Sequence, residues 1–225
     1  MSPTRIQWLK RIIFVACLFP LASLAARGLY NGLGANPISV ITHSTGIWAL
    51  VFLLITLGVT PLRKFAGLNW LLRLRRMLGL YAFFYACLHL LMYAWLDQFF
   101  NWSSMLKDVV GRPFITVGYV AFILLIPLAI TSTNGMVRRM GARRWQMLHR
   151  LVYLIAIAEI VHFFLYVKKD FTQPLIYGAI MTVLLGYRVI AALPITGRRM
   201  PRSGERASAR SARLAASNLS SRPPG

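Results

Sequence analysis

The sequence predicts an all-α integral membrane protein, a bundle of six transmembrane helices with both termini in the cytoplasm. Of its 225 residues, 57% are hydrophobic, whereas a soluble domain averages roughly 45–50% apolar residues. The excess lies in long runs, and a bilayer core about 30 Å thick needs roughly 20 mostly apolar residues per helix. Open sheet is excluded at that depth because lipid leaves its backbone polar groups unpaired. The distribution of basic residues predicts the orientation.

Six apolar runs are long enough to cross the membrane, and residues typical of loops separate them. Gly-Leu-Gly-Ala-Asn-Pro divides the first two runs, and Pro113 opens the fourth, where its missing N–H costs little. The predicted spans are 12–30, 40–59, 77–96, 114–131, 148–167 and 174–193. The predicted organisation is a cytoplasmic N-terminus at 1–11, the transmembrane domain at 12–193, and a basic tail at 194–225 with too little apolar surface to fold alone.

The net charge of +21 is explained better by topology than by nucleic-acid binding, because no nucleic-acid-binding motif surrounds the basic residues. Basic residues are concentrated in the N-terminus, the second and fourth connections and the tail. The two connections carry Arg63, Lys64, Arg73, Arg75, Arg76, Arg138, Arg139, Arg143 and Arg144. The positive-inside rule places these segments in the cytoplasm. The first run also has the features of a secretory signal peptide, and its cleavage would not change the remaining orientation.

The four histidines, His43, His89, His149 and His162, all lie in or at the ends of predicted spans. An ionisable residue inside a membrane is a functional hypothesis by default, and histidine is a common axial ligand of haem iron. His89 lies about 18 Å and His162 about 21 Å along two spans that run in the same direction. The similar depth predicts that this pair ligates one haem. The alternative is that each histidine makes a single hydrogen bond between helices.

His149 lies 13 residues before His162, which corresponds to a rotation of about 220° around a straight helix. The two side chains therefore point in different directions. A second haem near the cytoplasmic face would need another ligand, but the residue 13 positions before His89 is Arg76, which is not a haem ligand. The sequence thus predicts one haem and leaves a second one open.

Other residues near the predicted ligands allow two interpretations each. The helix face around His89 carries Tyr85, Ala86, Ala82 and Gly79, which would either leave room for a flat macrocycle or form a close helix contact. Glu159, one turn before His162, could orient the ligand, move a proton, or bond as a neutral acid to a neighbouring helix. Arg188 is expected to extend to the cytoplasmic interface.

Motifs in a fixed order along the chain, up to about residue 193, resemble a known family. They are Gly32–Pro37, His43–Gly46, Thr60–Leu62, Arg75–Leu80, Leu88–Leu90, Gly111–Pro113, Thr131–Asn134, Arg144–Tyr153 and His162. The stretch Arg144–Tyr153 is the most specific of them. The sequence resembles the MsrQ family (formerly YedZ), the haem-binding membrane subunits of bacterial periplasmic methionine sulfoxide reductase systems, within the ferric-reductase-like transmembrane superfamily.

The resemblance implies a b-type cytochrome in the bacterial inner membrane, with haem-ligand positions at His89, His149 and His162 and an associated FMN. It implies electrons that arrive from the quinone pool or a cytosolic flavin reductase. The chain would pass these electrons to a periplasmic molybdopterin-containing methionine sulfoxide reductase subunit that repairs oxidised envelope proteins. The chain would then be an electron-transfer subunit and not the catalytic one, with membrane lipid and these proteins as partners and no nucleic acid.

Two alternatives stay open at this point. The first is a related ferric-reductase-like or superoxide-generating cytochrome, although such proteins usually carry a fused flavin and nicotinamide domain, which this sequence does not show. The second is a non-redox transporter or assembly protein whose histidines only hold helices together. A transporter often has repeat symmetry or helices broken at the midplane, and the sequence shows neither.

Overall fold

The computed structural model describes residues 3–30 and 32–192, and within these residues every regular element is helical. The helices are α1 (Pro3–Leu29), α2 (Pro37–Ala66), α3 (Leu72–Met92), α4 (Trp102–Gly111), α5 (Pro113–Ile130), α6 (Asn134–Met140), α7 (Ala142–His149), α8 (Leu151–Tyr166) and α9 (Thr172–Ala192). A 3-10 turn, Asn69–Leu71, precedes α3, and a π-helical turn, Tyr93–Asp97, follows it.

Six stretches of the described chain are long and apolar enough to cross a membrane. They are Thr4–Leu29, Pro37–Ala66, Asn69–Asp97, Pro113–Ile130, Ala142–Tyr166 and Thr172–Ala191. The predicted six-helix membrane bundle is therefore confirmed. The cytoplasmic placement of the termini stays a prediction, and the predicted tail, 194–225, lies outside the described residues.

Local sequence explains where these helices begin and end. The side chain of Asn36 accepts a hydrogen bond from the Ser39 N–H at the start of α2, and Pro37 occupies the first turn. Gly67 ends α2 in the left-handed conformation, with φ of 68°. Pro113 similarly opens α5.

Several boundaries differ from the sequence prediction, each at the edge of the apolar core. Helix α1 begins at Pro3 and not at residue 12. The second span continues to Ala66 and the third begins near Asn69, because long basic side chains let a helix run on into the interface. The connection before Pro113 contains the short helix α4. The predicted span 148–167 is interrupted at Arg150, where the basic helix α7 meets α8.

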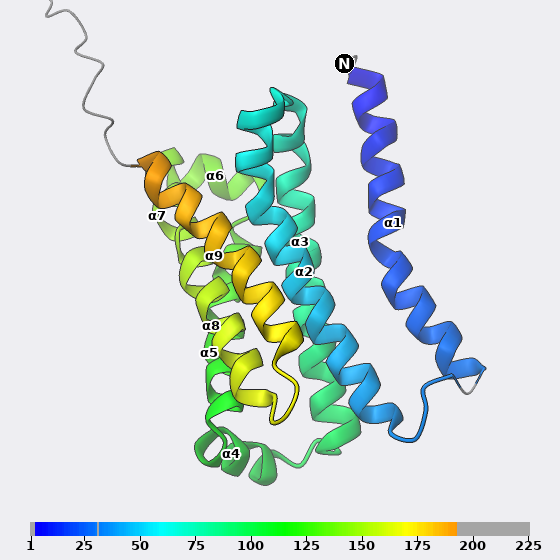
Figure 1. The fold of residues 1–225 in the computed structure, drawn as a ribbon. Coiled ribbons are helices and arrows are strands. Elements are labelled where there is room, and N and C mark those ends of the chain that lie inside the picture. Colours follow the sequence, from blue (N-terminus) through cyan, green and yellow to red (C-terminus); the bar gives the residue numbers. More distant parts are fainter. Residues whose placement is uncertain (1–2, 31, 193–225) are drawn as a thin grey trace, which may run out of the picture. The chain divides into compact units, whose positions relative to one another are not determined.

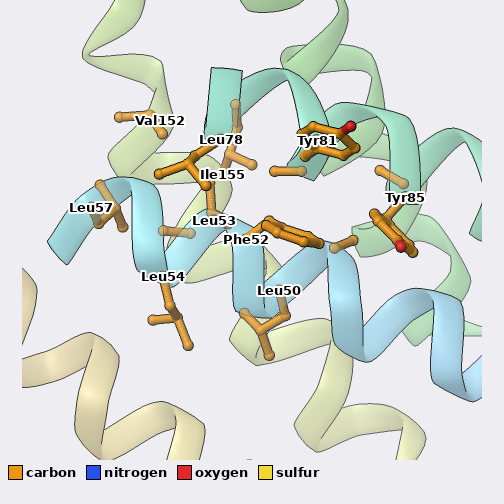
Figure 2. Close-up of a cluster of buried hydrophobic side chains, with 14 of the residues drawn as sticks. Leu50, Phe52, Leu53, Leu54, Leu57, Leu78, Tyr81, Tyr85, Val152 and Ile155 are labelled. Carbon is orange, nitrogen blue, oxygen red and sulfur yellow. The ribbon is translucent and has the colours of Figure 1, made fainter. Parts of the chain in front are cut away.

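Two helix pairs form the centre of the molecule: α2 packs along α3, and α5 along α8 (Figure 1). The pairs meet through contacts of α3 with α5 and of α2 with α8. Figure 2 shows Phe52 and Leu53 of α2 converging with Leu78 of α3 and Ile155 of α8 in one apolar core. These interior contacts fix the level of residues on α3 relative to residues on α8.

Helix α1 is attached to α3 by two tyrosine hydroxyls that donate to its backbone. Tyr81 donates to the Phe14 carbonyl at 2.8 Å, and Tyr85 donates to the Cys17 carbonyl at 2.9 Å. Many large apolar side chains instead face outward, among them Phe19 at 71% exposure. Such exposure is typical of a surface that contacts lipid acyl chains.

Contacts between distant segments define one end of the bundle, which we call the basic end. It comprises the end of α2, the start of α3, helices α6 and α7, and α9 near Arg188. A guanidinium nitrogen of Arg76 donates to the side-chain oxygen of Asn134, which joins the start of α3 to α6. Arg188 donates to the Leu57 carbonyl of α2 at 2.8 Å. The predicted alternation of basic connections thus gathers their arginines at one end of the helices.

Candidate cofactor site between two helix pairs

A cavity of about 430 Å³ lies between the two helix pairs, toward the end opposite the basic end. Its lining includes three histidines, His43, His89 and His162, together with Glu159 and Tyr119. The volume falls within the roughly 300–1,000 Å³ of ligand and cofactor pockets. The cavity therefore combines adequate space with nitrogen donors inside an apolar bundle.

The ring of His89, on α3, is held by a backbone carbonyl of α2. Its Nδ1 lies 2.8 Å from the Thr42 carbonyl oxygen. A carbonyl oxygen can only accept a hydrogen bond, so Nδ1 carries the proton. The neutral ring then has its lone pair on Nε2, the state required of a metal ligand.

His162, on α8, is held in the same way by α5. Its Nδ1 lies 2.6 Å from the Phe114 carbonyl oxygen, which assigns the same tautomer. Within the described part of the chain, neither His89 nor His162 has a hydrogen-bond partner at Nε2. Two lone pairs are thus available to a group bound in the cavity.

Two glycines make room for the histidine rings. A Cβ atom at Gly46 of α2 would lie 3.0 Å from ring atoms of His89, and one at Gly118 of α5 would lie 2.8 Å from Nδ1 of His162. Each glycine lies four residues after the residue whose carbonyl holds that ring, Thr42 or Phe114. The two halves of the site therefore repeat one local arrangement on different helix pairs.

The predicted proximity of His89 and His162 is confirmed. Their ring centroids are 6.2 Å apart and their ring planes are inclined at 82°. Among the described residues, no group of three or more His, Cys, Asp and Glu side chains could hold a metal ion. The two imidazoles alone could therefore hold only a metal that brings its remaining ligands with it.

His43 and Glu159 also line the cavity; the sequence had left the role of His43 open and given Glu159 three alternatives. The His43 ring contacts Phe163 and Tyr166, with centroid distances of 5.9 and 6.2 Å. The carboxyl group of Glu159 has no hydrogen-bond partner among the described side chains and backbone groups. Glu159 does not orient His162, whose Nδ1 is bonded to the Phe114 carbonyl.

The small-residue face around His89 is mostly a helix contact and not a cavity wall. Ala86 lines the cavity. Tyr85 and Ala82 are buried in the apolar core, at 1% and 2% exposure, and a Cβ at Gly79 would meet Thr56 of α2 at 3.6 Å. Only one of the four residues expected to make room for a macrocycle does so.

His149 lies away from the cavity, at the basic end. Its Nε2 is 3.2 Å from the Thr131 hydroxyl, and its ring stacks on Trp145 with a centroid distance of 4.0 Å. His149 contacts Thr131 at the end of α5, whereas His162 contacts Phe114 at its start. The predicted difference in direction assumed a straight helix and stays a prediction, because the span is interrupted at Arg150. The assignment of His149 as a ligand is not tested by these contacts and stays a prediction.

Comparison with known proteins adds a family to this geometry. Residues 45–160, which include His89 and end just before His162, match the family described as "Ferric reductase like transmembrane component". The protein-methionine-sulfoxide reductase heme-binding subunit MsrQ of Herminiimonas arsenicoxydans is 58% identical over 193 residues, which cover 85% of this chain and 88% of that relative. The chain belongs to the MsrQ family.

Other members of the MsrQ family are similar over most of their length. The subunit of Ralstonia nicotianae is 50% identical over 84% of this chain and 88% of its own. That of Rhodospirillum rubrum is 52% identical over 80% of this chain and 87% of its own. The names of these relatives describe each as the heme-binding subunit of a protein-methionine-sulfoxide reductase. The chain is thus a multi-pass membrane protein of a ferric-reductase-like family.

Sequence reasoning missed both glycines and the position of His43 in the cavity. In the sequence, Gly46 stands out only as part of the motif His43–Gly46, and Gly118 is one glycine within an apolar span with no motif around it. A glycine inside a membrane helix marks a close approach of another group. Which group approaches depends on the packing of a second helix, which the local sequence does not contain.

Proposed function

We propose that this chain is the haem-binding, electron-transferring membrane subunit of a protein-methionine-sulfoxide reductase. The observation that carries the proposal is the pair His89 and His162, facing each other across the cavity with Nδ1 protonated and Nε2 free. Membership of the MsrQ family supports it, because the relatives are named as heme-binding subunits.

The separation of the two rings would let both imidazoles bind one haem iron. Two imidazoles that share one metal ion at the usual metal–nitrogen distance of about 2.0 Å would have ring centroids about 6 Å apart. The observed separation is 6.2 Å. The two glycines also support this placement of the rings, since a side chain at Gly46 or Gly118 would fill the space that His89 or His162 occupies.

The protein's own groups would bind, orient and shield the cofactor. His89 and His162 would hold the iron, while the Thr42 and Phe114 carbonyls fix the direction of each ring and increase its basicity. Apolar residues such as Leu50 and Phe122 line the cavity and limit the access of water. When bound, haem supplies one-electron reduction and oxidation at its iron.

The finer features of the proposal follow the family resemblance. We propose one haem b and an associated FMN in a protein of the bacterial inner membrane with both termini in the cytoplasm. Electrons would come from the quinone pool or a cytosolic flavin reductase and pass to a periplasmic molybdopterin-containing reductase subunit. The position of the cavity supports this direction, because the basic end would face the cytoplasm by the positive-inside rule and the cavity lies toward the other end.

A reconstituted electron-transfer assay tests the proposal. The purified protein should show a b-type reduced-minus-oxidised spectrum with about one haem per chain. Once reduced, it should be fully reoxidised by a catalytic amount of the separate periplasmic reductase only when methionine sulfoxide is also present as the terminal electron acceptor. A colourless protein from haem-replete cells would contradict haem binding and favour the non-redox alternative. A reduced protein that the reductase cannot reoxidise would contradict the assigned partner.

A further inference from the structure

Two arginines lie within the membrane-spanning helices at the basic end, apart from the cofactor cavity. Arg188 is on α9 and hydrogen-bonds to the last turns of α2, and Arg75 is in the first turn of α3, which packs along α2. The two like charges lie near enough to repel each other. Both side chains are partly buried. Like charges that are partly removed from water are costly unless an anion compensates them.

Arg188 is fixed in place by neighbours from two helices. It donates to the Leu57 carbonyl at 2.8 Å, to the Thr60 hydroxyl at 3.3 Å and to the Tyr153 hydroxyl at 2.7 Å. Its side chain therefore turns toward α2 and α8, whereas the sequence predicted that it extends to the cytoplasmic interface. All three partners are neutral, and its Nε is buried without a hydrogen-bond partner in the described structure.

Arg75 has fewer hydrogen-bond partners among the described residues than Arg188 has. Its guanidinium forms no hydrogen bond or ion pair with a described residue, although it lies near Arg188 and Tyr153. The first turn of α3 also carries Arg73 and contains no acidic residue, and Leu71 provides no side-chain cap. Cations at a helix N-terminus add to the positive end of the helix dipole. The surroundings of Arg75 thus favour an anion.

The described chain offers no protein anion at this end. Its acidic side chains are Asp97, Asp108, Glu159 and Asp170. Asp97 and Glu159 line the cofactor cavity. Asp108 is paired at 3.2 Å with Arg112, which lines that cavity, and Asp170 accepts a hydrogen bond from the Thr172 N–H at the start of α9. All four lie toward the opposite end or along the cavity. Among the described residues, none therefore supplies a counter-charge to these two guanidinium groups.

We propose that Arg75 and Arg188 bind the phosphate of an anionic phospholipid headgroup at the basic end. Guanidinium groups match phosphate oxygens in charge and geometry, and basic pockets between membrane helices are known to bind lipid headgroups. The site lies inside a membrane span but near its end, the depth at which headgroups lie. The lipid would connect α3 to α9. This inference does not depend on the cofactor or on the electron-transfer proposal.

A thermal-shift titration of the full-length protein, purified in detergent and depleted of lipid, tests the site. Phosphatidylglycerol should raise the apparent melting temperature of the wild type, whereas phosphatidylcholine and sodium phosphate should not. Arg75→Gln should weaken the apparent phosphatidylglycerol affinity about tenfold or more. Arg73→Gln is the matched control, because it removes the same charge from an exposed residue of the same turn.

Arg188→Gln is a second variant for the same titration. If Arg188→Gln does not fold, Arg75→Gln alone tests the site, because Arg75 makes no hydrogen bond to a described residue whose loss would destabilise the fold. Equal affinity in Arg75→Gln and the wild type, or an equal loss in Arg73→Gln, would overturn the site. Stabilisation by sodium phosphate alone would overturn the lipid assignment in favour of a soluble phosphate compound. A lower haem content in Arg75→Gln would overturn it in favour of a haem carboxylate.

Discussion

The cavity histidines and the histidine at the basic end occupy different chemical environments, although His149 and His162 belong to one membrane span. His89 and His162 use Nδ1 to donate to a backbone carbonyl and present Nε2 to empty space. At His149 the nitrogen Nε2 is itself hydrogen-bonded to Thr131, and the ring is stacked on Trp145. The same residue type thus leaves Nε2 without a described partner in one place and hydrogen-bonds through Nε2 in the other.

The difference shows that the partner helix, and not the histidine itself, determines the role of each ring. A backbone carbonyl and a glycine four residues later on the facing helix hold and make room for one ring at Gly46 and the other at Gly118. At the basic end His149 instead contacts the Thr131 hydroxyl and the Trp145 ring. Three predictions test this comparison.

The largest effect is expected from removal of either cavity ligand. His89→Ala and His162→Ala should each lower the haem content per folded protein at least about tenfold, since loss even of a residue that only orients a ligand costs roughly 10–100-fold in metal affinity. Haem content is measured by the pyridine haemochrome method beside size-exclusion chromatography. His43→Ala, which changes another histidine of the same cavity, should retain haem. Unchanged haem content in both ligand variants would contradict the pairing.

An intermediate effect on haem content is expected when a methyl group is added at Gly46 or Gly118, next to the ring of His89 or His162. Gly118→Ala should lower haem content and shift the visible spectrum more than Gly46→Ala, because its Cβ would lie 2.8 Å and not 3.0 Å from the ring. Gly58→Ala, also on α2, is the control: a Cβ there meets nothing within 4 Å, and replacing a helical glycine is worth about 0.5–1 kcal/mol of stability. Normal haem content in Gly118→Ala would show that the glycine is not required.

The smallest effect is expected at the basic end. His149→Ala should keep the haem content and spectrum of the wild type while lowering stability by about 1 kcal/mol, the usual net value of one hydrogen bond. Thermal unfolding in detergent followed by near-UV circular dichroism, with parallel haem assays, measures both quantities. Loss of about half of the haem would instead establish His149 as a ligand of a second haem.

Much of the architecture was predictable because each helix that spans a membrane must carry its own apolar run. The six spans and the shared level of His89 and His162 follow from length and direction alone. The contacts of Gly46 and Gly118 could not be predicted, since they depend on how two distant helices face each other. Arg188 was expected to reach water, but its acceptors come from residues more than a hundred positions earlier and from α8.

The central claim, that His89 and His162 ligate one iron in the orientation seen here, is tested most directly by electron paramagnetic resonance of the oxidised protein. The rings are inclined at 82°, and nearly perpendicular axial imidazoles produce a strongly anisotropic low-spin ferric signal. We expect that signal in the wild type, and its loss in His162→Ala. A rhombic low-spin signal typical of parallel imidazoles, or a high-spin signal from iron with a single axial ligand, would contradict the account.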